Sequence, residues 1–329
     1  MKKATKTGAS RRRIAVDYTV YLFVRIVVCI IQMVPMSTCH RASSFLADLF
    51  SRRLGLRKKL TLENLRGAFP NRSESFYEAM SFAMWEHLFL MLFEIAHIPR
   101  KIHETNWRDS VTLKNKRGFL APLLTDRPSL YVSGHFGNFE VAGYVAGLFG
   151  VPTFSVARPL DNPFLNRFLN EFRGKKGQYM LPKQKSAPII QYLLDRGGNL
   201  ALLGDQHAGD KGCWVDFFGR EASCHKGLAL FSLSNHAVMS IFYVTRMGKA
   251  MKFEFGLNGS YDLFNPTEDQ KELGSVRQLT VWYNRRLEEA ILKAPEQYWW
   301  LHRRWREKPV RQKRKRVAPA QTTPPSEAA

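Results

Sequence analysis

Cysteine is scarce in this 329-residue sequence, and the few thiols form no recognisable pattern. The four cysteines, Cys29, Cys39, Cys213 and Cys224, include no C-x-x-C pair. Their number and spacing argue against a disulfide scaffold and against a cysteine-rich zinc module, and they fit a reducing compartment.

Several common catalytic signatures are also missing. Gly204 and Gly209 have the spacing of a phosphate-binding loop, but Asp210 precedes Lys211 and no serine or threonine follows. The sequence contains no G-x-S-x-G elbow and no H-E-x-x-H zinc motif. The histidines and cysteines within residues 207–225 match no standard zinc spacing. Any chemistry must therefore come from another arrangement of residues.

Acidic residues are few, and they are nearly absent from both ends of the chain. The sequence holds 50 Lys and Arg against 28 Asp and Glu, a formal net charge of +22. Residues 1–13 contain six basic residues and no acid, and residues 302–316 contain nine basic residues and one acid. Such a charge favours an anionic partner, which is a phospholipid, a phosphorylated glycolipid, an acidic protein or nucleic acid.

An apolar run near the N-terminus, Tyr18–Val34, raises the question of a membrane. Its 17 residues are broken only by Arg25 and Gln32. A perpendicular span needs about 20 apolar residues and a central charge is costly, so the run is marginal for crossing. Basic residues flank it on both sides, which prevents the positive-inside rule from orienting it. We favour an interfacial or obliquely inserted anchor; a buried core helix and a cleaved signal are the alternatives.

The next part of the chain is predicted to be helical. Residues 41–54 and 57–69 alternate apolar and basic positions at helical spacing. Ser73 is expected to cap a third helix that is apolar nearly all round and ends near Ala96, before Pro99. Such a helix is either deeply buried or faces lipid or an apolar ligand.

From about residue 118, short apolar strands alternate with helices, which predicts a layered α/β domain with a mainly parallel sheet. The expected strands are 129–133, 152–157, 199–203, 239–245 and 251–256. The expected helices are 137–149, 161–173, 186–196, 226–236 and 275–293.

The strongest chemical signal follows the first of these strands, in Ser133–Glu140. Two glycines flank His135, and a helix is expected to begin near Asn138. Ligands of open α/β sheets bind beyond the carboxyl ends of the strands, where His135 lies. Glu140, one turn into the helix, can hydrogen-bond one imidazole nitrogen and stabilise the imidazolium. The pair then forms a general base that acts on a hydroxyl or amine of the substrate; the alternative is a histidine in a glycine-rich turn beside an exposed glutamate.

The motif His135–Glu140 resembles the H-x4-D/E signature of glycerolipid-type acyltransferases, in particular the H-x4-E form of the lipid A late acyltransferases. The resemblance covers most of residues 14–308 and is carried further by Asn64–Pro70, Ala157–Pro163, Phe172–Gly174, Gly204–Gln206, Val215–Gly219 and Pro295–Trp305. Gly209–Val215 and Ser223–Lys226 depart from the pattern, which leaves the substrate identity open.

The resemblance implies a set of catalytic residues. His135 and Glu140 are the implied catalytic pair, and Arg173 and Asp205 fall where that family places its active-site Arg and Asp. Acyl transfer builds a tetrahedral oxyanion, for which the candidate donors are the backbone N–H groups after Gly137 and the guanidinium of Arg173.

Other residues are candidates for substrate binding. Arg158 suits a phosphate, or it is an ordinary surface residue in a loop. Asn138 and Gln206 border the expected crevice. Asp205 can position Arg173 or a substrate hydroxyl, or it caps a turn.

The implied activity is that of a membrane-associated O-acyltransferase of the cytoplasmic face of the inner membrane. It would move a fatty acyl chain from an acyl thioester, on acyl carrier protein or else coenzyme A, to a hydroxyl of a phosphorylated lipid A precursor, with no cofactor and no metal. Alternatives are another glycolipid or glycerophospholipid acceptor, a nucleic-acid-binding protein and a non-catalytic membrane scaffold; the absence of a nucleic-acid-binding motif argues against the second. The expected organisation is a basic leader (1–13), an anchor or interfacial helix (14–36), an acyltransferase domain (37–308) and a basic, then disordered tail (309–329).

Overall fold

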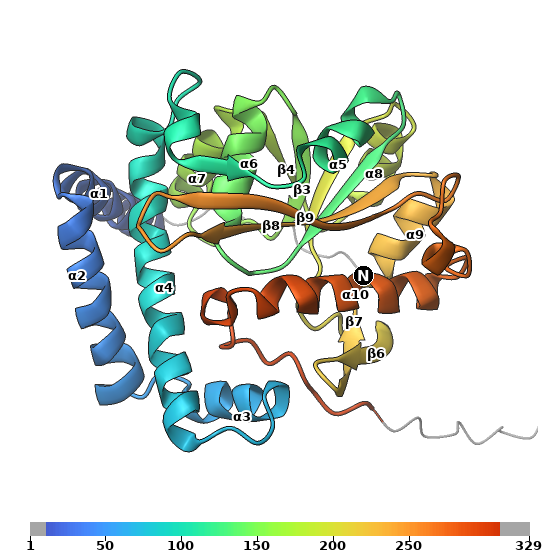
Figure 1. Cartoon of the computed structure of the whole chain (residues 1–329). Coiled ribbons are helices and arrows are strands. Elements are labelled where there is room, and N and C mark those ends of the chain that lie inside the picture. The colour runs from blue at the N-terminus through green and yellow to red at the C-terminus, as the bar shows by residue number, and fades with distance from the viewer. Residues whose placement is uncertain (1–10, 310–329) are drawn as a thin grey trace, which may run out of the picture.

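The computed structural model describes residues 11–309 (Figure 1), so most of the expected basic leader and tail lie outside the described residues. Its helices are α1 (Arg11–Met33), α2 (Met36–Ala47), α3 (Lys58–Ala68), α4 (Glu74–Lys101), α5 (Lys116–Leu120), α6 (Phe139–Leu148), α7 (Pro163–Gly174), α8 (Ala187–Leu194), α9 (Lys226–Ser234) and α10 (Val276–Leu292). Short helical turns are η1 (Asp48–Arg53), η2 (Trp107–Asp109), η3 (Ala121–Leu124), η4 (Glu268–Gln270) and η5 (Pro295–Gln297).

The prediction of an α/β fold with a mainly parallel sheet is confirmed. The strands are β1 (Val111–Leu113), β2 (Ser129–Ser133), β3 (Thr153–Ala157), β4 (Gln178–Pro182), β5 (Asn199–Leu203), β6 (Cys213–Phe217), β7 (Arg220–Cys224), β8 (Val238–Arg246) and β9 (Phe253–Tyr261). Seven of them form one sheet in the order β1-β9-β8-β2-β5-β3-β4, in which β8 and β9 pair antiparallel and the other neighbours pair parallel. β6 and β7 form a separate antiparallel hairpin.

Helices cover both faces of this sheet, and alternate residues of β2 point to opposite sides. On one face, Leu130 and Val132 join a large core with Leu228 of α9 and Tyr283 of α10. On the other face, a smaller core joins Val145 and its neighbours on α6 to β8 and β9. Figure 1 shows α6 above the sheet and α10 below it. The carboxyl ends of β2, β3, β4 and β5 therefore meet at one edge between two covered faces.

The strands that the sequence pattern did not predict are edge or hairpin strands. β4 lies at the end of the sheet with none of its residues buried, and β1 has three residues at the opposite end. The apolar run of β4 is only three residues long, Tyr179–Leu181, and β1 alternates apolar and polar residues; an edge strand is not enclosed on all sides.

The helix expected to end before Pro99 continues to Lys101. Ser73 does cap it, since its hydroxyl accepts a hydrogen bond from the Phe76 backbone N–H. Proline lacks only one N–H, and the last turn is held by burial of Ile98 and Ile102, both fully buried. The expected end was therefore about one turn too early.

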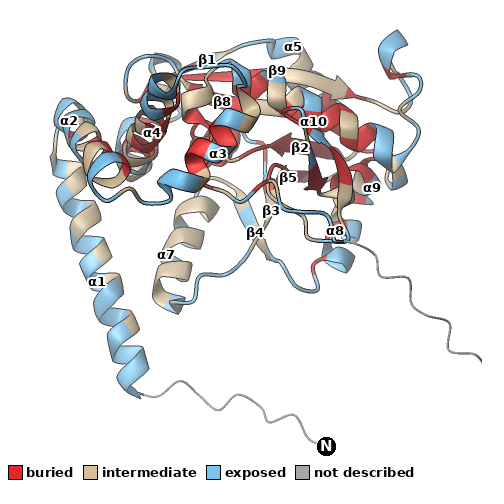
Figure 2. Ribbon diagram, turned by 90° about the horizontal axis from the view of Figure 1, so that it is seen from below, coloured by how far each residue is buried: buried red, intermediate tan, exposed pale blue. Residues whose placement is uncertain are grey.

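The interpretation of the N-terminal apolar run as a buried core helix is wrong, because α1 buries none of its residues. Figure 2 shows α1 at the side of the molecule, beside α7, with most of its surface exposed. Two hydrogen bonds connect α1 to the rest of the described chain: Gln32 donates to the Ala96 carbonyl, and Asn162 donates to the Asp17 carbonyl. Within residues 11–309, α1 and α4 are both long and apolar enough to cross a membrane, but α4 is partly buried in the domain.

Candidate active site

The turn after β2 carries His135 and is shaped by glycine. Gly137 has φ +59°, and a Cβ there would overlap the carbonyl oxygen of Val244 on β8. Only glycine fits both the left-handed backbone and this close approach. The chain therefore folds tightly onto β8 after His135 and enters α6 at Asn138, as the sequence pattern predicted.

His135 is paired with Asp205, which follows the neighbouring strand. Ser133 of β2 and Leu203 of β5 are register partners, so the residues two positions beyond them emerge side by side at the same sheet edge. His135 Nδ1 lies 2.9 Å from Asp205 Oδ1, and the His135 backbone N–H donates to Asp205 Oδ2 at 2.9 Å. One buried carboxylate thus fixes both the backbone and the ring of His135.

The hydrogen bonds indicate which nitrogen of His135 is free to act as a base. Gln206 Nε2, an amide donor, lies 3.2 Å from His135 Nε2. Nε2 therefore accepts and Nδ1 carries the proton that is donated to Asp205. Burial opposes the imidazolium, but the Asp205 carboxylate and, to a smaller extent, Glu140 together outweigh it and raise the pKa of His135 above its ordinary value. A substrate hydroxyl that replaces Gln206 would meet the basic lone pair directly.

Glu140 does not make the hydrogen bond to His135 that the sequence interpretation gave it. Its carboxylate faces α7, where Arg173 donates from Nε to Oε2 at 3.0 Å and from Nη2 to Oε1. Both side chains are largely buried, with 12% of Glu140 and 15% of Arg173 exposed. The imidazole is oriented by Asp205 instead, because Asp205 lies across the sheet edge from His135 while Glu140 points toward the facing helix. The same geometry corrects the suggestion that Asp205 positions Arg173.

Four of these groups, His135, Gln206, Glu140 and Arg173, line one cavity of about 600 Å³. Its polar lining includes Arg158, Lys183 and His225, besides the four groups already described. Apolar and small residues of α6, α8, α9 and the strands form the rest, including Ala142, Ala146, Ile190, Phe231, Phe242 and Phe255. A reactive polar end joined to an apolar interior suits a ligand with one reactive group and a hydrocarbon part.

Asn138 is not available for substrate binding, because it is fully buried beneath the turn. Its Oδ1 accepts from the Val141 N–H and so caps α6, and its Nδ2 donates to Glu94 Oε2 at 3.0 Å. One of the backbone N–H groups proposed for the oxyanion, that of Asn138, is also occupied. Gly137 N–H donates to the Gln297 carbonyl at 2.9 Å, and Asn138 N–H donates to the Val244 carbonyl at 2.8 Å. The prediction that Asn138 binds substrate is therefore wrong, and the Asn138 N–H is not a free donor for the oxyanion.

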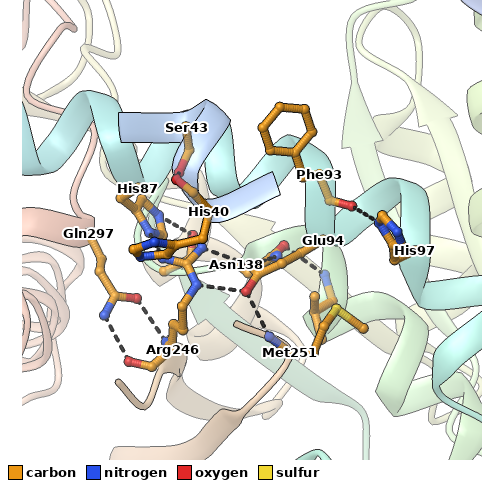
Figure 3. Close-up of polar contacts among 12 residues, drawn as sticks. His40, Ser43, His87, Phe93, Glu94, His97, Asn138, Arg246, Met251 and Gln297 are labelled. Carbon is orange, nitrogen blue, oxygen red and sulfur yellow. Dashed lines mark hydrogen bonds and ion pairs between the residues drawn. The ribbon is translucent and has the colours of Figure 1, made fainter. Parts of the chain in front are cut away.

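A buried polar network supports this turn from below (Figure 3). Arg246, at the end of β8, forms a two-pronged ion pair with Glu94 of α4, with both N···O distances 2.7 Å. Arg246 also donates to His87, whose other ring nitrogen lies 3.2 Å from the Gly137 carbonyl oxygen. Burial lowers the pKa of His87 well below its usual value, and Arg246 adds to the effect, so the ring is neutral. Nothing in the sequence pattern points to this network.

Arg158 lines the cavity but is largely exposed, at 78%, and within residues 11–309 its side chain pairs only with Asp161, which is also exposed. Lys183 was missed by the sequence interpretation. It directly follows Pro182, the register partner of Ala157, so the two cations leave neighbouring strands side by side. Lys183 could have been found only if β4 had been predicted, because β4 places Lys183 beside Arg158.

A histidine whose Nε2 is an acceptor, held by a carboxylate at the carboxyl edge of a parallel sheet and lining an apolar cavity, defines a site suited to group transfer onto a hydroxyl. Residues 6–307 match the family of bacterial lipid A biosynthesis acyltransferases. The chain is similar to the lipid A biosynthesis palmitoleoyltransferase of Escherichia coli (strain K12), with 26% identity over 259 residues that cover 77% of this chain and 80% of that protein. It is also similar to the lauroyltransferase of the same organism, with 25% identity over 289 residues, 86% of this chain and 90% of that protein.

Because the match spans most of the chain, the protein belongs to the bacterial lipid A biosynthesis acyltransferase family and is an acyltransferase. A remote structural likeness, with a TM-score of 0.39 and 9% identity, links 82% of the chain to all of the 1-acyl-sn-glycerophosphate acyltransferase of Thermotoga maritima. That likeness is too low to carry a conclusion.

Proposed function

We propose that the protein transfers a fatty acyl chain from an acyl thioester to a hydroxyl of a lipid A precursor, with His135 as general base. The observation that carries this proposal is the His135–Asp205 pair, which leaves His135 Nε2 as the accepting nitrogen on a residue that lines the apolar cavity. Membership of the lipid A acyltransferase family supports the acceptor class.

In the proposed reaction, Nε2 of His135 takes the proton of the acceptor hydroxyl as its oxygen attacks the thioester carbonyl carbon. The tetrahedral intermediate then expels the thiolate, which recovers the proton from His135. Asp205 stabilises the imidazolium that exists between these two events. Glu140 holds Arg173 in place at the cavity wall, and its negative charge also favours the imidazolium. The reaction as written uses no metal and no cofactor.

We further propose acyl carrier protein as the donor and the cytoplasmic face of the inner membrane as the site of action. The net charge of +22 favours an acidic carrier protein and a phosphorylated acceptor alike. The exposed apolar surface of α1 supports attachment to a lipid surface. Arg158 and Lys183 are proposed to bind the anionic part of the acceptor. Both side chains are exposed where they line the cavity, and neither forms an ion pair with a buried carboxylate of the described chain.

The test is lipid mass spectrometry of a strain that lacks the gene and is complemented with wild type, His135→Ala or His103→Ala. We expect the strain to lack one acyl chain on its lipid A, and wild type and His103→Ala to restore it. His103 is a suitable control because its ring meets only the Arg100 carbonyl among residues 11–309. An unchanged lipid A profile in the deletion strain, or full restoration by His135→Ala, would refute the proposal.

A further inference from the structure

The proposed acyl transfer needs a donor for the oxyanion, and part of the expected donor set is already engaged elsewhere. The backbone N–H groups of Gly137 and Asn138 donate to the carbonyls of Gln297 and Val244. Arg173 directs Nε and Nη2 to Glu140. Negative charge on the thioester oxygen would form beside His135, inside the cavity. A charge there that has no hydrogen-bond donor or cation nearby raises the free energy of the transition state.

His225 is a cavity-lining side chain whose hydrogen-bonding capacity is unused. It follows β7 and immediately precedes α9, and its ring makes no hydrogen bond, ion pair or ring contact within the described chain. Its backbone is nevertheless fixed, because the Tyr283 hydroxyl donates to the His225 carbonyl at 3.1 Å. A ring on an anchored backbone, open to the cavity and free of partners, can present an N–H to a ligand.

The segment that carries His225 is packed against the segment that carries Asp205. The Ala208 N–H donates to the Ser223 carbonyl at 3.1 Å, which joins the residues after Asp205 to β7. A Cβ at Gly204 would lie 2.7 Å from Leu228 on the first turn of α9. The start of α9 therefore lies against the residue that precedes Asp205, on the wall of the cavity that His135 also lines.

The surroundings keep the His225 imidazole neutral. Burial lowers its pKa, the Arg304 guanidinium lowers it further, and Lys183 acts in the same direction, against the opposing effect of Asp205. A neutral imidazole in an electropositive setting can donate a hydrogen bond to a developing anion without transferring its proton. The negative charge then stays on the substrate oxygen. Arg158 and Lys183 also line the cavity, but both are exposed, so water screens their charge.

We infer that His225 is a catalytic residue that donates an N–H to the thioester carbonyl oxygen as it becomes the oxyanion. The acceptor oxygen forms a bond to the carbonyl carbon and its proton passes to His135. The carbonyl π electron pair moves onto the oxygen that His225 contacts. When that pair re-forms the C=O bond, the C–S bond breaks and the thiolate takes the proton from His135. This inference rests on the proposed function.

The experiment compares His225→Gln with His225→Leu in the full-length enzyme, using steady-state acyl transfer and thermal melting. Gln retains an N–H donor and Leu has a similar size without one. We expect His225→Leu to lower kcat by about 10²–10³-fold, with KM for the thioester nearly unchanged. His225→Gln should retain at least about tenfold more kcat than His225→Leu. His103→Ala serves as a histidine control outside the cavity.

Two outcomes separate this inference from the proposed function. If wild type transfers acyl chains and His135→Ala does not, but the Gln and Leu variants have equal kcat, the role of His225 is refuted while the function stands. A loss that appears only in KM for the acceptor refutes it as well. If wild type itself transfers no acyl chain from a thioester to a lipid A precursor, the proposed function fails first.

Discussion

The imidazole of His135 lies between one group that accepts its proton and one that donates to its lone pair. Burial lowers the pKa of His135, but the Asp205 carboxylate and, to a smaller extent, Glu140 together raise it by more. Burial likewise raises the pKa of Asp205, but His135 and the backbone N–H lower it by more, so the carboxylate stays charged. The negative charge of Asp205 therefore lies next to the ring that becomes an imidazolium during the reaction.

Replacement of Asp205 by Asn should lower activity and change its pH dependence. A general base works when it is neutral, so wild-type kcat/KM should rise with pH as His135 loses its proton, with a midpoint above the ordinary value for histidine. Without the carboxylate the pKa of His135 falls, and this limb should move to lower pH, while kcat falls by about 10²–10⁴-fold. A pH profile of kcat/KM measures both effects, and an unmoved limb would contradict the assignment.

Glu140 and Arg173 should behave as one unit in stability measurements. Each is largely buried and satisfies the other, so removal of one leaves an uncompensated charge. We expect Glu140→Gln and Arg173→Gln each to destabilise the fold by about 3 kcal/mol, and the double variant to cost little more than the larger single change. Urea unfolding of the four proteins provides the cycle. Fully additive losses would show that the pair is not coupled.

At the scale of elements, the start of α6 depends on contacts from segments far away in the sequence. Asn138 caps α6 and also donates to Glu94, which is held by Arg246 of β8. Figure 3 shows Glu94 between Asn138, Arg246 and Met251. The turn that carries His135 is thus braced by α4 and by the end of β8 through one buried carboxylate.

Asn138→Ala should therefore lower the free energy of unfolding by more than the loss of an ordinary helix cap does. The loss of the cap is worth about 1 kcal/mol, and the loss of a buried hydrogen bond to a carboxylate adds about 1–2 kcal/mol. Ser275→Ala is the matched control, because Ser275 caps α10 at the surface without a buried carboxylate partner and should cost only about 1 kcal/mol. Chemical denaturation measures both; equal losses would show that the bond to Glu94 contributes nothing.

Much of the sheet could be predicted because its central strands are enclosed. β2 is buried at every residue and reads as a continuous apolar run bounded by turns, and its carboxyl end could be assigned with His135 at the crevice. β4 was not predicted: its apolar run, Tyr179–Leu181, lies at the end of the sheet, where none of the residues of β4 is buried. Without β4, nothing placed Lys183 beside Arg158.

The partner of His135 could not be predicted because it depends on register. Asp205 lies 70 residues away in the sequence and faces His135 only because Ser133 pairs with Leu203. Glu140, five residues away, was the nearer choice, but the side to which a helical side chain points depends on the facing helix. In this protein that helix is α7, which provides Arg173. Local spacing located the site, whereas long-range pairing decided which carboxylate serves the imidazole.

At the scale of the whole molecule, α1 lies outside the core while the rest of the described chain encloses the site. Its apolar side chains remain exposed, with Phe23 66% and Ile26 59% exposed. Tyr18 packs edge-on against Phe164 at the start of α7, the helix that also carries Arg173. An anchor placed on α1 would thus hold a lipid surface close to one wall of the active site.

The double variant Phe23→Asp/Ile26→Asp should release the protein from vesicles that contain anionic phospholipid. Full burial of such a side chain in an apolar phase is worth about 1.5–3 kcal/mol, so two charges in their place should lower partitioning by more than about 100-fold. The fold should survive, because neither side chain is buried in the protein. Leu124→Asp/Phe264→Asp is the matched control, since both residues are exposed apolar side chains outside α1. Sedimentation with vesicles at low and high salt separates apolar insertion, which salt leaves largely intact, from attraction by the basic residues, which salt weakens. Equal sedimentation of the two double variants would show that α1 is not the anchor.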